Sequence, residues 1–437
     1  MACAAQLAMV SSVAMTATDV HRTIDAVWRI ESARLIAGLT RLVRDVGRAE
    51  ELAQDALVIA LEQWPHSGIP DNPAAWLMAT AKHRAIDHLR HARLRARKHE
   101  TLGHELEMEQ ENHGSTLEAS ADDAIGDDLL RLMFIACHPL LSTEARTALT
   151  LKLLAGLSTA EIARAFLVPE ATIAQRIVRA KRTLADAHVP FEIPRHEQLS
   201  DRLASVLEVI YLVFNEGYSA TAGEDWMRPA LCEEALRLGR ILAELAPHES
   251  EVHGLVALME IQASRLRARL GTSGEPLRLM DQDRVHWDHL LIQRGLIALA
   301  RGETLGESRG PYLLQAAIAA CHARAATAAD TDWVYITALY DELARVSPTP
   351  VVQLNRAVAV AMAYGPAAGL ALADQLAAQG ALRSYHLLPS VRGDLLARLG
   401  RFAEARSEFE RAADLTRNGP ESRLLRDRAA ACQRGEI

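Results

Sequence analysis

The chain has 437 residues, longer than one ordinary domain, so we expect two to four domains. Hydrophobic residues make up 49% of the sequence and aromatic residues only 4%, a composition that favours helices over sheets. The formal net charge of −8 excludes binding of nucleic acid through a general positive charge, so any such binding must use local basic stripes.

The N-terminal segment and the cysteines indicate the compartment. Residues 1–18 are apolar but lack a basic start, so we expect a disordered or misassigned extension, with Met9 and Met15 as alternative first residues, and not a signal peptide. No later segment is apolar and long enough to span a bilayer, so we expect no membrane association. The cysteines are scattered without a C-x-x-C pair, which predicts a reducing cytoplasm and neither a zinc site nor a disulfide framework. They are Cys3, Cys137, Cys232, Cys321 and Cys432.

The first helical block, residues 19–100, contains a helix with a mixed outer face. In RAEELAQDALVIALEQW, Val58 and Leu61 fall on the outer side, near Glu50 and Gln54. A mixed apolar and polar outer face favours docking onto a partner, although a single exposed Val is common in any helix. The predicted inner face consists of Leu52, Ala53, Ala56, Leu57 and Ala60.

The next helix, residues 76–99, combines a buried stripe with a basic stripe. Four basic residues fall within about 80° of one another on a helical wheel, which indicates either a phosphate-binding surface or a solvated face. Trp64 and Trp76 flank the preceding loop, where aromatic rings suit unstacked single-stranded bases, unless both are simply core residues. The basic residues are Lys82, Arg90, Arg93 and Arg97, and the buried stripe is Leu77, Ala81, Ala85 and Leu89.

An acidic segment, residues 101–126, reads as a linker, and a second small block follows at residues 127–188. There, Ser158 and Glu161 predict a capping box, and Leu167-Val168-Pro169 breaks the helix. A new helix begins near Glu170. This is the layout of a helix-turn-helix, although many such turns carry Gly where this chain has Leu167.

The second helix of this pair carries a polar outer face. Ile173 and Ile177 point inward at i, i+4. Gln can pair with adenine and Arg with guanine in the major groove, while Lys and further Arg residues hold phosphates. A packed hairpin with a solvated Arg face is the alternative. The outer residues are Thr172, Gln175, Arg176 and Arg179, followed by Lys181 and Arg182.

Beyond Pro190 and Pro194 the chain is helical to its end, with no alternating strand pattern. Residues 189–347 fit no repeat, and residues 348–437 have the small-residue spacing of a tetratricopeptide repeat, with a period of about 34 residues. A generic helical hairpin is the alternative. The positions are Gly393, Gly400, Ala405, Phe409 and Ala412, and one period earlier Ala359, Pro366, Ala371 and Ala378.

Three polar-aromatic patches in this half suit either catalysis or buried hydrogen-bond networks, and we favour the networks. No H-E-x-x-H, G-x-S-x-G or phosphate loop is present in the sequence. Repeat arrays present concave binding surfaces, so interaction is the expected role. The patches are Asn215-Glu216-Gly217-Tyr218, Asp281-Gln282-Asp283-Arg284 with Trp287, and Thr331-Asp332-Trp333.

Three segments in this order resemble an extracytoplasmic-function sigma factor of bacterial RNA polymerase: AEELAQDALVIALEQWP, NPAAWLMATAKHRAIDHLRH and LSTEARTALTLKLLAGLSTAEIARAFLVPEATIAQRIVRAKRTL. The resemblance covers residues 20–188. The later segments YLVFNEGYSA, DQDRVHWD, TDWVYITALYDEL and PVVQLNRAVAVA resemble the subgroup with a long helical, tetratricopeptide-like extension. The resemblance implies an all-α protein with sigma region 2 (19–100), sigma region 4 (127–188) and that extension.

The resemblance also assigns residues. The core-polymerase set, docking on the clamp of the largest subunit, is Glu50, Glu51, Leu52, Gln54, Asp55 and Val58. The set for the single-stranded −10 element is Asp71, Asn72, Trp76, Thr80, Lys82, His83, Arg84 and Arg90. The loop Ile69–Asn72 would help to melt and hold the same element. The set for the duplex −35 element is Thr172, Gln175, Arg176, Arg179, Lys181 and Arg182. The linker acids that would thread near the RNA path are Glu105, Glu107, Glu109, Glu111, Glu118, Asp122 and Asp123.

The resemblance implies a protein that catalyses no reaction, needs no cofactor or metal, and gives core polymerase its promoter specificity. Family members often carry Asn near Lys82 and His83, and its absence here leaves the −10 base preference open. The extension is expected to regulate the sigma part in cis, or to bind a protein or peptide, and deletion of residues 190–437 should change promoter activity. The rivals are a stand-alone helix-turn-helix regulator and an enzyme in the C-terminal half that uses Asp281 or Asp283.

Overall fold

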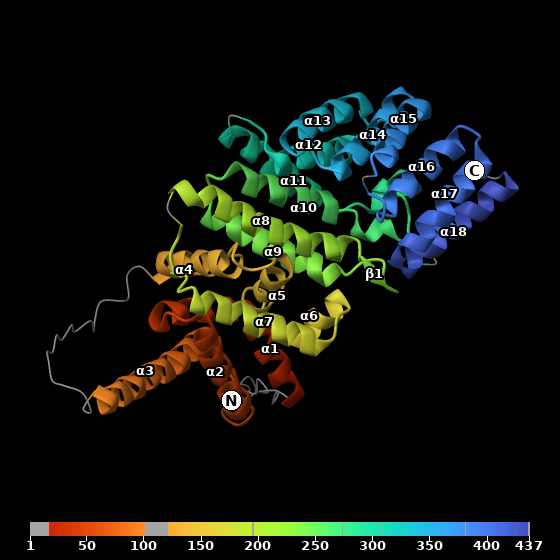
Figure 1. Ribbon diagram of the computed structural model, residues 1–437. Coiled ribbons are helices and arrows are strands. Elements are labelled where there is room, and N and C mark those ends of the chain that lie inside the picture. Colours follow the sequence, from red (N-terminus) through yellow and green to blue (C-terminus); the bar gives the residue numbers. More distant parts are fainter. Residues whose placement is uncertain are drawn as a thin grey trace, which may run out of the picture. The chain divides into compact units, whose positions relative to one another are not determined.

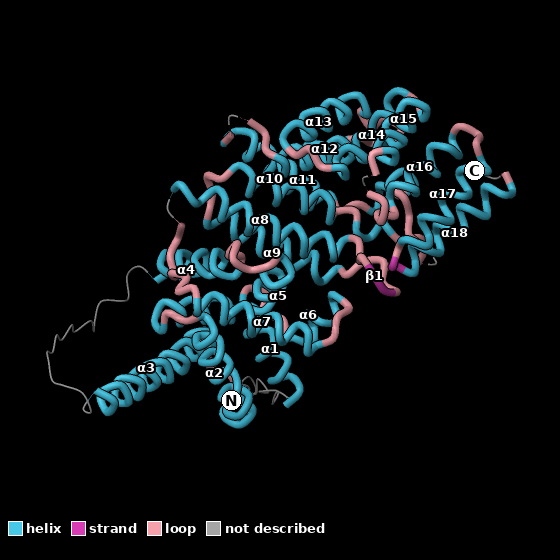
Figure 2. Tube along the Cα trace, in the orientation of Figure 1, coloured by secondary structure: helices cyan, strands magenta, loops and turns pink. Residues whose placement is uncertain are grey.

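The computed structural model describes residues 17–100, 121–194, 196–272, 274–306, 308–380 and 382–435. The all-α prediction is confirmed: these residues form eighteen α-helices, three short 3-10 helices and two strands of two residues each (Figures 1 and 2). The chain forms two compact units, residues 1–162 with 170–202 and residues 163–169 with 203–437. No described helix combines the length and the apolar character needed to cross a membrane.

The first unit packs its helices around Trp64, Leu35, Leu77, Phe134 and Leu149, which are all buried. Asp45 begins α2, because its side chain accepts a hydrogen bond from the Arg48 amide. The predicted buried stripe of α3 is confirmed for its first three residues, whereas the fourth is half-buried. The helices are α1 (Ala17–Val43), α2 (Val46–Ser67), α3 (Pro73–Glu100), α4 (Ala121–Ala136), α5 (Thr143–Leu153), α6 (Thr159–Phe166) and α7 (Glu170–Asp186), and α8 (His196–Tyr218) starts here.

The second unit continues from α8 with helices that pack around Leu258, Leu314, Ile336 and Leu339. The α-helices are α9 (Pro229–Leu245), α10 (Ser250–Ala263), α11 (His289–Leu305), α12 (Pro311–Arg324), α13 (Trp333–Val346), α14 (Pro350–Tyr364), α15 (Pro366–Ala378), α16 (Leu387–Arg398), α17 (Phe402–Leu415) and α18 (Gly419–Arg434). The 3-10 helices are η1 (Leu266–Arg269), η2 (Leu279–Asp281) and η3 (Arg284–His286).

Small residues bring the last helices close together at some of the predicted positions. A Cβ placed on Gly393 of α16 would lie 2.8 Å from the Phe409 ring of α17, so only glycine fits there. Ala405, Phe409 and Ala412 are fully buried. Of the positions one period earlier, Ala359 is buried as well. The prediction is wrong for Ala371 and Ala378 of α15 and for Gly400 in the turn after α16, which are exposed because they face away from the neighbouring helices. Figure 1 shows α16, α17 and α18 lying side by side.

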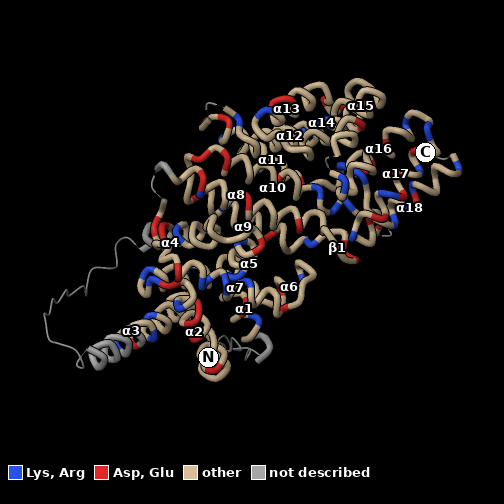
Figure 3. The backbone as a smooth tube through the Cα atoms, in the orientation of Figure 1, with Lys and Arg blue, Asp and Glu red and all other residues tan. Residues whose placement is uncertain are grey.

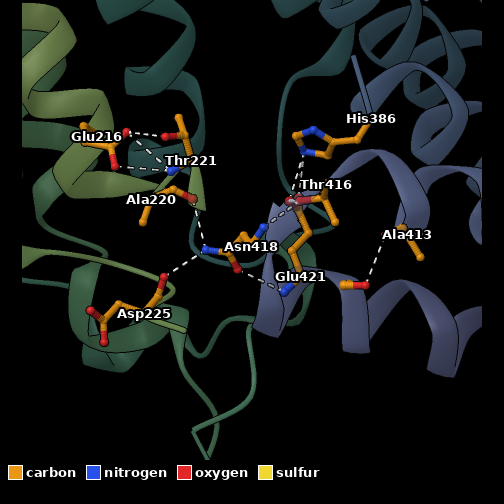
Figure 4. A network of polar contacts seen from close by, with 10 residues as sticks. Glu216, Ala220, Thr221, Asp225, His386, Ala413, Thr416, Asn418 and Glu421 are labelled. Atoms are coloured by element: carbon orange, nitrogen blue, oxygen red, sulfur yellow. Dashed lines mark hydrogen bonds and ion pairs between the residues drawn. The ribbon is translucent and has the colours of Figure 1, made fainter. Parts of the chain in front are cut away.

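Two very short parallel strands, β1 (Ala222–Gly223) and β2 (Arg417–Asn418), pair within the second unit. The sequence predicted no strands, because two residues are too few to show an alternating pattern. Asn418, 1% exposed, secures the pair: its amide donates to the carbonyls of Ala220 (3.0 Å) and Asp225 (2.8 Å). Its side-chain oxygen accepts from the Glu421 amide (3.1 Å) and caps α18, as Figure 4 shows.

Candidate polymerase and nucleic-acid interface

Helix α2 presents a mixed face that fits the predicted docking surface only in part. Val58 is 52% exposed, and Glu51 and Asp55 are also exposed. Leu52 is buried, as its predicted place on the inner face requires. The prediction that Glu50 lies on the outer face is wrong, since Glu50 is only 3% exposed.

The predicted polymerase and −10 sets meet at one ion pair. Arg84 Nη1 of α3 lies 2.9 Å from Asp55 Oδ2 of α2, and both side chains are about half exposed. An ion pair this exposed contributes at most about 1 kcal/mol. It orients two neighbouring helices at the surface and leaves both groups accessible to a partner.

The loop before α3 is held by its own residues. Asn72 caps α3 by accepting from the Ala75 amide (3.0 Å), so this member of the −10 set also has a structural role. Trp64 is buried core, as the alternative interpretation held, and Trp76 packs edge-on against it with ring centroids 5.3 Å apart. Trp76 is only half-buried, so part of the residue remains exposed to solvent.

The start of α3 carries the remaining −10 candidates. Thr80 is half-buried, whereas Asp71, Lys82 and His83 are exposed. Arg90 is also exposed, and its guanidinium lies 3.7 Å from the Asp87 carboxylate. The side chains of Arg93 and Arg97 lie outside the described residues, as do Glu105, Glu107, Glu109, Glu111 and Glu118 of the linker and the side chains of Asp122 and Asp123.

The helix-turn-helix forms from α6 and α7. The predicted capping box is present: the Glu161 amide donates to Ser158 Oγ (3.1 Å), and Glu161 Oε2 accepts from the Ser158 amide (2.8 Å). After α6, Leu167 takes a left-handed backbone (φ 50°), and the Val168 amide bonds back to the Ala163 carbonyl (3.1 Å). Leu167 thus occupies a position that usually favours glycine, at a cost in backbone strain.

Helix α7 buries Ile173 and Ile177, as predicted, and this leaves a basic face outward. Gln175, Arg179 and Arg182 are exposed, and Figure 3 shows basic residues along α7. Thr172 and Arg176 are half-buried. The pKa of Glu144 lies below its ordinary value, first because its own backbone amide and the Ser142 hydroxyl bond the carboxylate, and in a smaller part because Arg176 attracts it.

The structure adds a contact that no local pattern indicated. Lys181 of α7 forms an ion pair with Glu50 Oε2, and Lys152 Nζ of α5 lies 3.7 Å from Glu50 Oε1. Gln54 Nε2 also donates to Glu50 Oε1 (2.7 Å). These four side chains form what we call the Glu50 cluster, in which a predicted polymerase contact and a predicted −35 contact bind each other.

The three polar-aromatic patches of the second unit join through arginines. Arg269 stacks 3.6 Å above the Tyr218 ring and donates to the Tyr218 carbonyl. Arg284 lies 4.7 Å from the Trp287 ring centre and donates to the His322 and Ala325 carbonyls and to Thr331 Oγ1. Arg265 joins the two groups, because its guanidinium lies 5.8 Å from the Tyr218 ring centre and 5.7 Å from the Trp287 ring centre. The patches therefore form one connected network, consistent with the favoured structural interpretation.

The acidic members of these patches have local partners. Glu216 is buried and binds Arg228 and the Thr221 hydroxyl (2.9 Å). Asp281 is exposed and pairs with Arg278 (2.6 Å), and Asp283 is exposed and caps η3 by accepting from the Val285 amide (3.0 Å). Within the described residues, no group of three or more His, Cys, Asp or Glu side chains is placed to hold a metal ion.

Family models match three parts of the chain. Residues 30–95 match Sigma-70 region 2, residues 131–184 match Sigma-70 region 4, and residues 202–303 match a family of unknown function, DUF6596. The first two matches span α2, α3 and the helix-turn-helix, where the predicted binding sets lie. No solved structure gave a significant match.

Two sigma factors match about a third of the chain, and one uncharacterized protein matches nearly all of it. The chain is 33% identical over 144 residues to the ECF RNA polymerase sigma factor SigC of Mycobacterium tuberculosis (strain CDC 1551 / Oshkosh), covering 33% of this chain and 72% of that protein. It is 30% identical over 148 residues to the ECF RNA polymerase sigma factor SigL of M. tuberculosis (strain ATCC 25618 / H37Rv), a match that covers 33% of this chain and 76% of that protein. An uncharacterized protein of Rhizobium meliloti (strain 1021) is 43% identical over 392 residues, covering 90% of this chain and 91% of its own length.

Proposed function

Because the chain belongs to the extracytoplasmic-function (ECF) family of RNA polymerase sigma factors, we propose that it binds core RNA polymerase, recognises the −35 and −10 promoter elements and promotes promoter opening. In this role it catalyses no reaction itself and needs no cofactor. The observation that carries the proposal is the capped helix-turn-helix whose second helix exposes Gln175, Arg179 and Arg182.

Each surface has a part in this proposal. The exposed residues Glu51, Asp55 and Val58 of α2 dock on the clamp of the largest polymerase subunit. The loop before α3 and the first turns of α3 hold unpaired −10 bases, with Trp76 as the stacking residue and Lys82 and Arg90 on phosphates. Helix α7 lies in the major groove of the −35 element, with Thr172, Gln175, Arg176 and Arg179 at the bases and Arg182 on phosphate.

The extension is proposed to regulate these two regions in cis. Residues 202–303 match a family of unknown function. The proposal for residues 348–437 rests on their small-residue spacing and on the close approach of Gly393 of α16 to the Phe409 ring of α17. Such an array presents a surface for a protein or peptide partner. Deletion of residues 190–437 should change promoter activity strongly, whereas unchanged activity would contradict a regulatory extension.

Run-off transcription with purified core polymerase over a pool of promoter fragments tests the central proposal. Discrete start sites that appear only with the protein support a sigma factor. Arg176→Ala should lower transcription from a specific promoter by roughly 5- to 150-fold, since a bidentate base contact is worth about 1–3 kcal/mol, without changing core affinity. Arg294→Ala, an exposed arginine of α11, is the matched control.

A stand-alone regulator is the alternative, and the same reagents distinguish it. A regulator protects promoter DNA from cleavage without polymerase, whereas a sigma factor gives specific protection and new start sites only with core polymerase. Footprinting with and without core polymerase therefore decides between the two. An equal loss of core affinity and promoter activity in Arg176→Ala would contradict the role given to that residue.

A further inference from the structure

We propose that a cleft in the extension binds a basic segment of a partner protein, in which arginine or lysine residues flank an apolar residue. The cleft has a volume of about 590 Å³ and lies between the loop after β1, the loop after η1 and helix α18. The inference deepens the proposed role of the extension as a surface for a protein or peptide partner, and it rests on that role.

One face of α18 forms the first wall of the cleft. Four residues of this helix line the cleft, and they recur at i, i+3, i+4 and i+7, which places them on one side of a helix. Another face of α18, with Leu425, Ala429 and Cys432, packs in the core instead. The helix is therefore held by its core face and presents the other face to a partner. The lining residues are Pro420, Arg423, Leu424 and Asp427.

Hydrogen bonds fix the other two walls. The Asn418 side chain donates to the carbonyls of Ala220 (3.0 Å) and Asp225 (2.8 Å), which ties the loop after β1 to the start of α18 (Figure 4). In the loop after η1, the Gly271 amide donates to the Glu275 carbonyl (2.8 Å). The cleft is therefore formed without a partner, as binding pockets usually are, and its volume falls within their range of about 300–1,000 Å³.

The inner surface of the cleft is largely apolar. Trp226 and Met227 are half-buried, and the guanidinium of buried Arg269 lies 5.4 Å from the Trp226 ring centre, which holds the indole in place. Leu270 is 37% exposed, and Leu424 is half-buried. These side chains leave apolar area that an apolar residue of a partner can cover, and removal of that area from water favours binding.

The charged residues of the cleft are mostly acidic. Four acids and one arginine line it, all exposed, so its formal charge is −3. Arg423 pairs with Glu224 (3.1 Å), whereas Asp225 and Asp427 have no ion pair within the described residues. Opposite charge attracts and selects a partner across an interface, so the cleft favours a basic one. The acids are Glu224, Asp225, Glu275 and Asp427.

The arrangement favours a peptide segment over a free amine. Asp225 lies in the loop after β1 and Asp427 on α18, so a small cation pairs with only one of them at a time. A single exposed ion pair contributes little. A segment with two basic residues pairs with both carboxylates and brings the residue between them onto the apolar surface, so the separate contributions combine.

Fluorescence anisotropy with the full-length protein tests the inference. The probe is the fluorescein-labelled peptide Arg-Leu-Arg-Leu-Arg, and two comparison peptides carry Glu in place of each Arg or Ser in place of each Leu. The protein should bind the probe at least about tenfold more tightly than either comparison peptide. Agmatine, a free guanidinium compound, should displace the probe only at a concentration about 100-fold above that needed of the unlabelled peptide.

A pair of charge variants locates the binding site. The double variant Asp225→Asn with Asp427→Asn should bind the probe at least about fivefold more weakly than wild type, because one exposed ion pair contributes up to about that factor. Glu233→Gln with Glu244→Gln is the matched control. It removes two exposed carboxylates of α9 that do not line the cleft, and it should bind the probe as wild type does.

The apolar surface is tested by a second pair of variants. Leu270→Ser should weaken binding of the probe at least about threefold, because it removes apolar area from the cleft. Ile297→Ser, at an apolar residue of α11 that is 70% exposed, should leave binding unchanged. Both positions are exposed, so this pair decides the question if the double aspartate variant does not fold.

Several results would overturn the inference. One is equal binding of the probe and of either comparison peptide by wild type. Another is equal binding of the probe by a cleft variant and its matched control. Agmatine that displaces the probe as readily as the unlabelled peptide does would assign the cleft to a free cation instead. Failure of the proposed function is recognised separately, because run-off transcription needs core polymerase and promoter DNA, whereas the anisotropy measurement contains neither.

Discussion

Replacing Asn418 by alanine should destabilise the extension more than any ordinary loss of a helix cap. Asn418 is 1% exposed, and its side chain makes three hydrogen bonds: two from its amide group to the Ala220 and Asp225 carbonyls, and one from the Glu421 backbone amide to its side-chain oxygen. Alanine removes all three and leaves two carbonyls and one amide without these partners (Figure 4).

The magnitude follows from these contacts. Loss of an N-cap costs about 1 kcal/mol, and each further hydrogen bond contributes about 1 kcal/mol net, so Asn418→Ala should cost about 3 kcal/mol. Thr349 is the exposed N-cap of α14 in the same unit, and the one hydrogen bond recorded for its side chain is the capping bond that its hydroxyl accepts from the Val352 amide (3.2 Å). Thr349→Ala should therefore cost only about 1 kcal/mol.

Hydrogen exchange measured by mass spectrometry checks the difference. A loss of about 3 kcal/mol corresponds to roughly 100-fold faster exchange of the α18 amides, against about fivefold for the α14 amides in Thr349→Ala. Asn418→Asp keeps the acceptor that caps α18 but loses both amide donors, so it should cost at least about 2 kcal/mol. The reasoning fails if Asn418→Ala is no more disruptive than Thr349→Ala.

Three further predictions concern other parts of the chain. Arg44 is exposed and has a left-handed backbone (φ 55°) between α1 and α2, a conformation that is strained for any residue except glycine. The Arg44→Gly variant should therefore have a free energy of unfolding about 1 kcal/mol higher than wild type, measured by urea denaturation. A lower free energy of unfolding would contradict backbone strain at Arg44. Burial, and after it the charges of Arg265 and Arg284, lower the pKa of His322 from 6.5 to about 4. Between these two pH values the imidazole binds a proton in the unfolded chain but not in the folded chain, so the free energy of unfolding falls as the pH drops from 6.5 to 4. Wild type should lose about 2 kcal/mol more unfolding free energy between pH 7 and pH 5 than His322→Gln does, as measured by urea denaturation at each pH. An equal pH dependence in the two proteins would refute the role of His322. Val58→Asp should weaken core binding at least tenfold in a pull-down titration, whereas Ile297→Asp, at an apolar α11 residue that is 70% exposed, should not.

The local features of the binding regions were predictable from the sequence. The Ser158–Glu161 capping box, the inward Ile173 and Ile177 and the break at Leu167 all depend on residues within one or two helical turns. Side-chain spacing and backbone preference are properties of short segments, so such features follow from the order of residues alone. The resemblance to the sigma factor family depends on these same segments.

Pairings between distant segments were decided only by the tertiary structure. Nothing near Glu50 indicates that Lys181, more than 100 residues later, neutralises it, and the helical period by itself placed Glu50 on an outer face. Likewise, nothing near Asn418 in the sequence indicates that two of its side-chain hydrogen bonds reach residues nearly 200 positions earlier. Periodicity assigns a side chain to a face of its helix, but which other helix covers that face depends on how the folded chain packs, and that packing determines which charges are buried and what they bind.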